Sequence, residues 1–413
     1  MGFERRTATA ANRKRGAVKV SFVIPFYGIY AKGGAETLCR RLAENLVLRG
    51  VDVEVLTTTL RDFTSHWNQL FYEPGIYNLN GVTIRRFNPA LVDTSVFGAI
   101  NHRIIAREPI TSTEEVDYMI NAVHSDAMYS FIGDNHHGRL YFFLPYLFGT
   151  SLKGSSIVPQ KSFLIPCLHD EGYAYLDVTR RMFARVNGAL FNSKAEMRLA
   201  NRIYGGLPLC EQAFIGVGVD RIYGPDAAGF REKYKLGDSP FILYAGRRDA
   251  TKNTPALIEY FARFSRMYPK SALKLVLIGP GEVSVPEDVA GNVMDLGFVS
   301  LEDKKNAYSA ATALCQPSLN ESFSLVMMES WLMQRPVLVH SACEVMKEGV
   351  EECGGGFAFG NFPEFAESVG YLLENPSEAS EMGRRGRRYV LENFTWDIVC
   401  GRFKRFLSAC EGL

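Results

Sequence analysis

The chain has 413 residues, of which 47% are hydrophobic, and this length is too great for one ordinary core but fits two domains. Lys and Arg total 46 against 45 for Asp and Glu, so no overall charge directs the molecule to nucleic acid or to an anionic surface. The cysteines form no C-x-x-C pair, which predicts free thiols in a reducing, cytoplasmic compartment and argues against structural zinc.

The first sixteen residues are polar and basic and contain no apolar core of signal-peptide length, so we expect a disordered leader. The aromatic run Leu140–Phe148 is interrupted by Pro145 and is far shorter than the ~20 residues of a membrane span. Two interpretations remain for residues 139–153. A buried helix is favoured, and peripheral contact with a membrane that holds a polyprenyl-linked glycan is the alternative.

The first domain opens with a strand, a loop and a helix. The apolar, β-branched run Val18–Pro25 leads into a loop with Gly28, Gly33 and Gly34, and Val51–Thr57 supplies the next strand after a helical pattern. This order predicts a parallel βαβ unit with its ligand at the carboxyl ends of the strands. The loop holds no complete G-x-G-x-x-G, which argues against a dehydrogenase.

Polar residues follow another predicted strand of this domain. Leu164–Leu168 is expected to be a buried strand, and it ends in His169, Asp170 and Glu171. Such an edge is where α/β folds keep chemistry, so His169 is a catalytic candidate and Asp170 its orienting or acceptor-binding neighbour. A histidine that merely caps the strand end is the structural alternative.

Two adjacent histidines, His136 and His137, precede the aromatic run. Adjacent side chains point in different directions, so we do not expect a shared metal. We expect these histidines to line the cleft between the domains and to contact an acceptor.

The composition changes between Asp220 and Asp238 to Gly, Pro and charged residues, which places the domain boundary near Tyr223. A strand at Phe241–Gly246 then opens the second domain, and Arg247 and Lys252 lie on the loop that leaves it. Arg offers a planar fork and Lys a mobile charge, so together they can neutralise a diphosphate. Arg248 is the less favoured substitute for Arg247.

The stretch Asn320–Pro336 places Glu321 in a loop and Glu329 on a helix. The unpaired amides at the helix start, around Ser322 to Leu325, form an anion seat. At 1.5 Å per residue, Glu329 lies about 8 Å beyond the helix start, roughly the reach from a diphosphate to a ribose. The spacing suits a nucleotide diphosphate sugar, whereas two surface or capping carboxylates are the structural alternative.

This stretch resembles the Glu-x7-Glu signature of retaining GT-B glycosyltransferases, specifically glycosyltransferase family 4, and the resemblance extends from Val18 to about Trp396. Many members carry Gly where this chain has Ser322 and Ser324, which changes how closely a ligand approaches the backbone. The resemblance implies an α/β fold of two Rossmann-like domains whose parallel sheets face a deep cleft. It also implies that His169 lies near the anomeric carbon and that Arg247, Lys252 and Glu321 act on the donor.

The other donor contacts implied by the resemblance come from the glycine-rich first loop, from the base-contacting position and from the Glu-x7-Glu helix start, namely Gly33, Gly34, Phe298, Ser322, Phe323, Ser324, Leu325 and Glu329. Four segments are expected. They are a leader at residues 1–16, an acceptor domain at 17–222, a nucleotide-sugar domain at 223–392, and a helix at 393–413 that packs back on the first domain.

We therefore expect a cytoplasmic glycosyltransferase that moves a hexose or deoxyhexose from a nucleotide diphosphate sugar to a glycan or polyprenyl-linked glycan, in cell-surface polysaccharide assembly. Family precedent implies retention of configuration. No Asp-x-Asp motif is present, so neither a metal nor a resident cofactor is expected. The basic run Arg384–Arg388 is read as a solvated face and not as a nucleic-acid site. A nucleotide-sugar epimerase of the same architecture and a non-catalytic nucleotide-binding module are the rival hypotheses.

Overall fold

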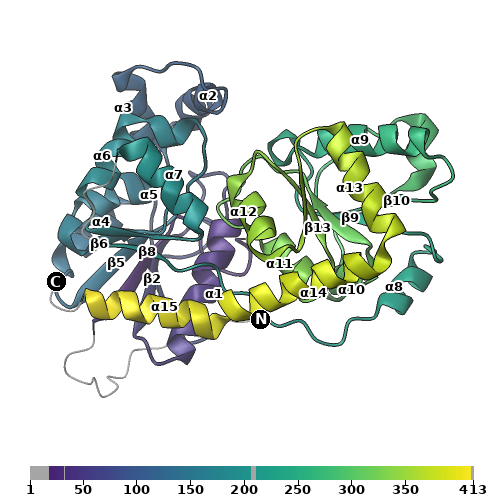
Figure 1. Cartoon of the computed structure of the whole chain (residues 1–413). Helices are drawn as coiled ribbons and strands as arrows, with labels where there is room; N and C mark the ends of the chain where they lie inside the picture. Colours follow the sequence, from purple (N-terminus) through teal and green to yellow (C-terminus); the bar gives the residue numbers. More distant parts are fainter. Residues whose placement is uncertain (1–17, 32, 206–210, 411–413) are drawn as a thin grey trace. The chain divides into compact units, whose positions relative to one another are not determined.

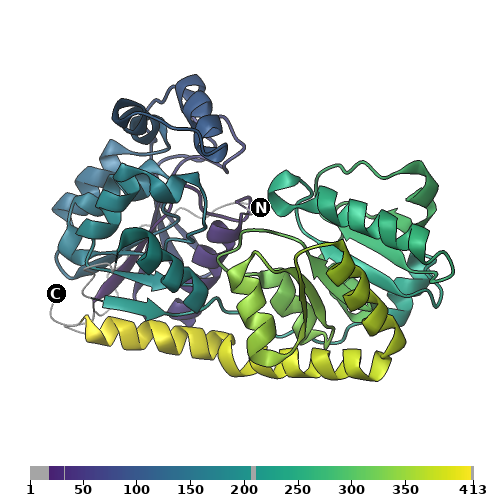
Figure 2. The ribbon, with the colours of Figure 1, turned by 45° about the horizontal axis from the view of Figure 1, so that its top comes forward.

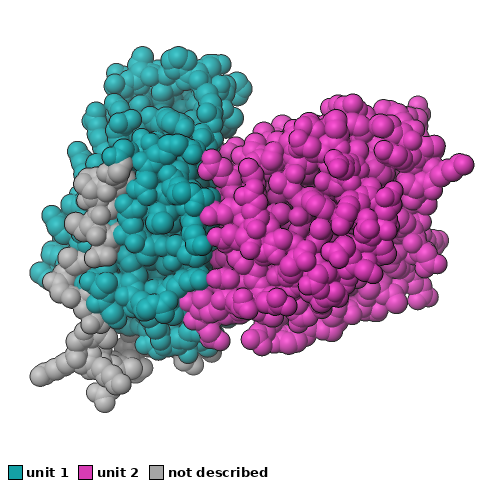
Figure 3. Space-filling model, viewed as in Figure 1, with its two compact units in different colours: residues 1–218, 399–413 teal, residues 219–398 magenta. Residues whose placement is uncertain are grey.

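The computed structural model describes residues 18–31, 33–205 and 211–410. The predicted leader at residues 1–16 lies outside this part of the chain. The chain forms two compact units, residues 1–218 with 399–413 and residues 219–398, which Figure 3 distinguishes by colour. The division after Gly218 lies close to the boundary that the change in composition predicts near Tyr223.

Unit 1 is built on an eight-stranded sheet of order β3-β4-β2-β1-β5-β6-β7-β8, in which only the β3–β4 pair is antiparallel among the described strands. The strands are β1 Lys19–Val23, β2 Val53–Thr58, β3 Gly75–Leu79, β4 Val82–Phe87, β5 Arg139–Phe143, β6 Ser162–Leu164, β7 Gly188–Phe191 and β8 Glu211–Phe214. Because the parallel strands share one direction, the loops after β1 and β6 reach the same edge of the sheet.

Helices cover both faces of this sheet (Figures 1 and 2). They are α1 Gly34–Leu48, α2 Thr94–Ile105, α3 Ser112–Asn121, α4 Asp126–Asp134, α5 Gly149–Leu152, α6 Asp177–Arg185 and α7 Lys194–Tyr204, with short 3-10 turns η1 Gly154–Ser156, η2 Pro159–Lys161 and η3 Gly172–Tyr175. Buried residues of α2 to α7 join Tyr141 and Phe143 of β5 in one core cluster. The intervening side chain of β5, Phe142, points to the other face, as the two-residue period of a strand requires.

The aromatic run at residues 140–148 corrects one prediction. Arg139–Phe143 is the strand β5 and not part of a buried helix, and the short helix α5 begins only at Gly149. Tyr141, Phe142 and Phe143 are fully buried, because β5 lies between β1 and β6 and is covered on both faces. A strand buried on both faces reads as a continuous apolar run, which periodicity alone does not distinguish from a helix.

Unit 2 has a six-stranded, all-parallel sheet of order β11-β10-β9-β12-β13-β14. Its strands are β9 Phe241–Ala245, β10 Lys274–Ile278, β11 Val293–Asp295, β12 Ala313–Gln316, β13 Val337–His340 and β14 Gly356–Phe359. The order is that of the doubly wound Rossmann fold, in which the strand order reverses between β9 and β12 and ligands bind beyond the carboxyl ends there.

The helices of unit 2 are α8 Ala227–Lys233, α9 Thr254–Met267, α10 Leu301–Ala310, α11 Leu325–Leu332, α12 Glu344–Cys353, α13 Phe362–Glu374 and α14 Pro376–Asn393, with 3-10 turns η4 Ala250–Lys252 and η5 Glu287–Asn292. Apolar side chains of α9 and α13 form one core cluster with β9, β10 and β12. The amphipathic pattern of α9 follows from Leu257, Phe261 and Phe264, which are buried at helical spacing.

The last helix, α15 Trp396–Ala409, contributes its residues from Val399 onward to unit 1. Phe403 packs with its ring centroid 5.9 Å from Phe22 and 5.0 Å from Phe142, and Phe406 lies 5.3 Å from Phe163. The Nζ of Lys404 donates to the carbonyl of Arg49 at 2.6 Å. The apolar face of α15 therefore covers the face of the first sheet that β5 reaches with Phe142.

Candidate active site

The loop after β9 places the two predicted cations at the carboxyl edge of the second sheet. Asp249 organises this loop, because its carboxylate accepts from the Lys252 amide at 3.1 Å and pairs with Arg247. Burial raises the pKa of Asp249, but the hydrogen bond of Thr251 and the charge of Arg247 outweigh it and lower the pKa. The Arg247 side chain is 61% exposed, so its guanidinium is accessible to a ligand.

Arg248 points into the protein. Its side chain is only 5% exposed and pairs with Asp295, the last residue of β11, and its amide donates to the Pro280 carbonyl at 2.7 Å. The partner loop needs glycine there, because Gly281 has a φ of +110° and a Cβ would lie 2.3 Å from the Arg248 carbonyl oxygen. Of the two neighbouring arginines, Arg247 is therefore the one that can reach a phosphate.

Lys252 and Glu321 meet across the β9 and β12 loops. The Lys252 Nζ lies 2.6 Å from Glu321 Oε1, and the amide of Gln316 donates to the same oxygen at 3.2 Å. The side chain of Asn253 donates to the Pro317 carbonyl at 3.1 Å, which ties the two loops together. The structure thus brings a predicted phosphate cation and a predicted sugar carboxylate into one cluster.

The start of α11 carries no side-chain cap. Ser324 is the N-cap residue, but its hydroxyl makes no capping bond and, within the described residues, is buried without a hydrogen-bond partner. The first helical bond is donated by Met328 to the Ser324 carbonyl at 3.2 Å. The amides of the first turn have no partner inside the helix, so the polar groups here can receive an anion.

Glu329 lies on α11 as predicted, and α10 supplies its partners. The Tyr308 hydroxyl and the Lys304 Nζ each lie 2.7 Å from Glu329 Oε2. Burial and then the nearby Glu329 charge raise the pKa of Tyr308, so its hydroxyl stays protonated and donates. Both contacts go to one oxygen, and Oε1 stays available to accept from a ligand hydroxyl.

The two predicted aromatic contacts differ in setting. Phe298 is 73% exposed on the loop after β11. Phe323 packs on Phe394, with ring centroids 5.1 Å apart, and so stabilises the loop before α11. The exposure of Phe298 makes its ring accessible to a flat ligand, and the ring of Phe323 packs on that of Phe394.

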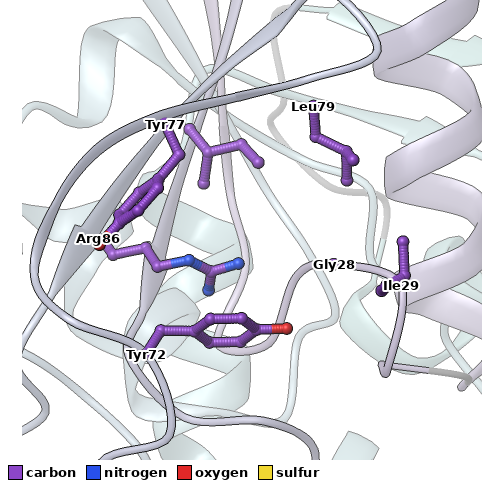
Figure 4. A pocket seen from close by; sticks show the side chains of 7 residues that line it. Gly28, Ile29, Tyr72, Tyr77, Leu79 and Arg86 are labelled. Carbon is purple, nitrogen blue, oxygen red and sulfur yellow. The ribbon is translucent and has the colours of Figure 1, made fainter. Parts of the chain in front are cut away.

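In unit 1, the loop after β1 is held by Arg86 (Figure 4). The buried guanidinium donates to the carbonyls of Tyr27 at 2.7 Å and Thr58 at 3.0 Å and stacks 3.6 Å above the centre of the Tyr72 ring. Burial lowers the pKa of Arg86 to about 10. Gly28 faces this pair with a φ of +141°, and a Cβ would lie 3.0 Å from the Tyr72 hydroxyl.

The same loop contains the predicted Gly33 and Gly34. Gly33 is the N-cap of α1 in extended backbone, and a Cβ there would meet the Glu36 side chain, whereas Gly34 has open space around its Cβ position. The pocket beside the loop is lined by Gly28, Ile29 and Tyr72 among others and has a volume of about 20 Å³, enough for one water molecule. The glycine that the geometry requires is therefore Gly28.

The strand predicted at Leu164–Leu168 lies earlier in the chain, because β6 spans Ser162–Leu164 and shares only Leu164 with the prediction. Cys167 has a φ of +54°, which turns the chain so that His169 follows on a loop. The His169 Nδ1 lies 3.6 Å from Glu171 Oε1, and the Tyr146 hydroxyl donates to that oxygen at 2.9 Å. Burial raises the pKa of Glu171, but the hydrogen bonds of His169 and Tyr146 outweigh it and lower the pKa.

A buried carboxyl group supports this loop from below. Glu196 of α7 is 1% exposed and accepts from the amides of Leu168 and Asn192, each at 2.6 Å. Burial raises the pKa of Glu196 to about 7, against the lowering effect of those amides and of the His169 charge. Glu196 thus fixes the residue before His169, and the S-x-x-E spacing after Ser193 is the capping signal that could have found it.

The remaining acceptor candidates are not gathered with His169. Asp170 is bound by Arg107 at 3.0 Å and by Arg202 at 3.5 Å. His136 and His137 precede β5, so they lie at the amino edge of the sheet, while His169 follows the carboxyl edge. The His136 Nδ1 lies 2.7 Å from the Gly133 carbonyl oxygen, a local contact at the end of α4.

Sequence reasoning missed the residues that hold the site residues in place. They are the partners of Glu321, Glu329, Arg247 and His169 and the carboxyl group that holds Leu168, namely Gln316, Lys304, Tyr308, Asp249, Glu171 and Glu196. Lys304 and Tyr308 have the i, i+4 spacing of one helix face, which is a signal for a shared partner.

No helix in the described ranges combines the length and the apolar character of a membrane span.

Comparison with known proteins identifies the second unit by sequence. Residues 227–389 match the family model described as glycosyl transferases group 1. A GDP-mannose-dependent alpha-(1-6)-phosphatidylinositol monomannoside mannosyltransferase of Mycolicibacterium smegmatis is 25% identical over 259 residues, 58% of this chain and 68% of that protein. An uncharacterized glycosyltransferase of Methanocaldococcus jannaschii is 24% identical over 407 residues, 92% of this chain and 96% of its own.

Solved structures extend the similarity to the whole fold. The crystal structure of Anabaena Alr3699/HepE in complex with UDP and glucose matches with a TM-score of 0.67 and 15% identity, and it covers 95% of this chain and 100% of that one. The GT-B architecture accounts for both sheets and for the strand order of the second. It also accounts for the match of residues 227–389. Residues 227–389 are therefore a glycosyl transferases group 1 domain, the whole chain has the fold of solved GT-B glycosyltransferases, and its relatives support a nucleotide-sugar-dependent glycosyltransferase similar to family 4.

Proposed function

We propose that this glycosyltransferase moves a hexose or deoxyhexose from a nucleotide diphosphate sugar to a glycan or lipid-linked glycan, with retention and without a metal, in cell-surface polysaccharide assembly. The observation that carries the proposal is the cluster of Lys252, Glu321 and the uncapped start of α11 beyond β9 and β12. A diphosphate and a sugar hydroxyl need these two kinds of group side by side.

The leaving group is the first chemical requirement. As the glycosidic bond breaks, the nucleoside diphosphate gains negative charge, and positive groups that are already in place stabilise it. Arg247 is exposed and supplies the planar fork, Lys252 supplies a point charge, and the first-turn amides of α11 supply oriented dipoles. In this proposal these groups do the work for which other transferases use a metal ion.

The two carboxylates orient the donor. Glu329 keeps Oε1 available while Tyr308 and Lys304 hold Oε2, an arrangement suited to a ribose hydroxyl. Glu321, which shares Oε1 between Lys252 and Gln316, accepts from hydroxyls of the transferred sugar once the phosphate draws Lys252 away. Phe298, at 73% exposure, offers its ring to the base.

In this proposal unit 1 binds the acceptor and supplies His169. His169 and Glu171 lie on the loop after β6, with the His169 Nδ1 3.6 Å from Glu171 Oε1. We assign His169 to the reacting centre, where positive charge develops on the sugar. One relative is a GDP-mannose-dependent mannosyltransferase, and one similar structure holds UDP and glucose. Both sugars are hexoses, which supports a hexose donor, but the two nucleotide bases differ.

A thermal-shift screen against UDP, GDP, ADP, TDP and CDP, each with and without magnesium, tests the donor assignment. A ligand at one hundred times its dissociation constant stabilises the native state by about 2.7 kcal/mol, or roughly 5 to 10 °C in the unfolding midpoint. One diphosphate is expected to give this shift without magnesium, and Lys252→Ala is expected to reduce it by about half or more, because a tenfold loss of affinity leaves about 1.4 kcal/mol of the stabilisation. No shift with any of the five would refute the nucleotide-sugar site proposed here.

The matched donor sugar, incubated alone, separates transfer from epimerisation. A transferase releases nucleotide only slowly without an acceptor, and adding a glycan or polyprenyl-linked acceptor accelerates release. Conversion of the donor to an epimer in the absence of acceptor would instead favour the epimerase.

A further inference from the structure

Unit 2 has a second charged cavity at the opposite edge of its sheet. Its volume is about 240 Å³, and residues before β12 and β13 line it together with parts of α8, α10, α13 and α14. Thr312 and Pro336 directly precede these strands, whereas Glu321 follows β12. The cavity is therefore separate from the donor cluster, which lies beyond the carboxyl ends of the same strands.

Two guanidinium groups line the cavity, from Arg231 of α8 and from Arg335 before β13. No carboxylate stands among the lining residues of the cavity. Burial and then the charge of Arg231 lower the pKa of Arg335, which shows that the two cations act on each other. Two like charges in a partly enclosed space attract an anion as counter-charge.

Part of each guanidinium has a structural role at the end of α10. Arg231 donates to the carbonyls of Gly237 and Ser239 at 2.9 Å and of Ala310 at 2.7 Å, and Arg335 donates to the Ser309 carbonyl. The bonds to Ser309 and Ala310 satisfy the last carbonyls of α10, which have no partner within the helix. They do not neutralise two full charges.

Donor capacity remains after those bonds. Within the described residues Arg335 donates only through Nη2, to the Ser309 carbonyl, so Nη1 stays available as a donor, whereas Nε is buried and out of reach of the cavity. The cavity is also far larger than the roughly 10 to 15 Å³ of accessible volume that holds one water.

We propose that this cavity is a second anion site, which binds inorganic phosphate or a small phosphate monoester between Arg231 and Arg335. The planar fork of arginine matches phosphate oxygens, and two forks match the two charges of a monoester. The site is independent of donor binding, because its residues precede the strands whose carboxyl ends carry Lys252 and Glu321.

The test is thermal unfolding of the full chain with sodium phosphate or glycerol 2-phosphate, against sodium chloride at equal ionic strength. Each titration is repeated with Lys252→Ala, in which anion binding at the donor site is weakened. A saturable rise in the unfolding midpoint that persists in Lys252→Ala is expected. A larger response to the monoester assigns the site to phosphorylated metabolites, and equal responses assign it to free phosphate.

Arg335→Gln is expected to weaken the phosphate affinity, as obtained from the rise of the unfolding midpoint, by about tenfold or more. The reason is that a hydrogen bond to a charged group is lost. The exposed Arg387→Gln serves as its matched control and leaves the response unchanged. Ala227→Glu adds a carboxylate at a lining position, one helical turn before Arg231, and is expected to abolish the response, whereas the exposed neighbour Ala228→Glu retains it. An unchanged response in both Arg335→Gln and Ala227→Glu, or its loss in Lys252→Ala, overturns the proposal.

Discussion

Lys252 and Glu321 form an ion pair, with Nζ 2.6 Å from Oε1, although one is assigned to phosphate and the other to sugar hydroxyls. The pair is partly buried, with the two side chains 26% and 12% exposed. Each residue thus neutralises the other when no donor is bound. A diphosphate must compete with Glu321 for the Lys252 ammonium, so the pair sets part of the cost of donor binding.

Glu321→Gln is expected to separate binding from turnover. The amide removes the negative charge that competes for Lys252, so the affinity for the nucleoside diphosphate stays the same or rises. The rate of transfer falls by about a hundredfold or more, because the amide holds a sugar hydroxyl less well in the transition state. Calorimetric titration of the diphosphate and initial rates with the full donor measure the two effects.

Lys252→Ala is the complementary variant, and it should weaken diphosphate binding by about tenfold or more. Exposed Lys270→Ala is the matched control for the loss of one charge. Equal losses of diphosphate affinity in Glu321→Gln and Lys252→Ala would contradict the assignment of separate partners to these residues.

Arg247 and Arg248 are neighbours with opposite expected effects. Arg247 is exposed and bound to Asp249, so Arg247→Ala is expected to reduce kcat/KM by about a hundredfold while the free energy of unfolding changes little. Arg248 is buried and bound to Asp295, so Arg248→Ala is expected to lower the free energy of unfolding by about 2 kcal/mol. Urea unfolding and steady-state kinetics on both variants provide the comparison.

Each arginine variant is the control for the other. Full turnover by Arg247→Ala would remove it from the diphosphate clamp. Loss of turnover by a stably folded Arg248→Ala would show that Arg248 and not Arg247 carries the contact.

Much of the fold was readable from periodicity, because parallel strands alternate regularly with helices. Phe241–Ala245 was predicted as a strand almost to the residue, with its cations on the following loop. Residues 140–143 were misassigned to a helix, because a strand covered on both faces loses its two-residue alternation of apolar and polar side chains. The strand predicted at Leu164–Leu168 was placed too late in the chain, since β6 is Ser162–Leu164 and sequence gives no sign that Cys167 takes a left-handed backbone.

The positions of the candidate residues in the fold were predictable where a residue follows a strand, as for Arg247, Lys252 and Glu321. Contacts were not predictable where a partner comes from elsewhere in the chain. Tyr308 reaches Glu329 from another helix, and Glu196 reaches Leu168 from twenty-eight positions away. Such contacts follow from how the helices pack on the sheet, which sequence spacing does not contain.

Tyr308→Phe is expected to raise the KM for the donor by about tenfold with a smaller change in kcat. The hydroxyl donates to Glu329 at 2.7 Å, so its removal loosens a carboxylate assigned to the ribose, which is remote from the bond that breaks. Tyr389→Phe is the control, because that hydroxyl donates to a carboxylate of similar kind, Glu352, at 2.6 Å. A larger fall in kcat than rise in KM would place Glu329 at the reacting centre.

The free energy of unfolding is expected to depend on pH through the protonation of Glu196. Burial raises its pKa from 4.5 to about 7 in the folded state, so between those values the folded chain holds a proton that the unfolded chain has released. The stabilisation is therefore complete below the unfolded pKa and is lost as the pH rises towards 7, a change on the order of 3 kcal/mol. Urea unfolding of the wild type at several pH values in this window measures it.

Glu196→Gln has no proton to release, so it is expected to remove this slope, whereas the exposed control Glu73→Gln keeps it. The variant also tests the support of His169. A glutamine oxygen can accept from only one direction where the carboxylate accepts from both Leu168 and Asn192, so the loop loosens at every pH. Turnover is then expected to fall about tenfold without a change in diphosphate affinity. A slope that survives in Glu196→Gln would assign the titration to another group, and loss of diphosphate affinity would show that the variant disturbs more than the His169 loop.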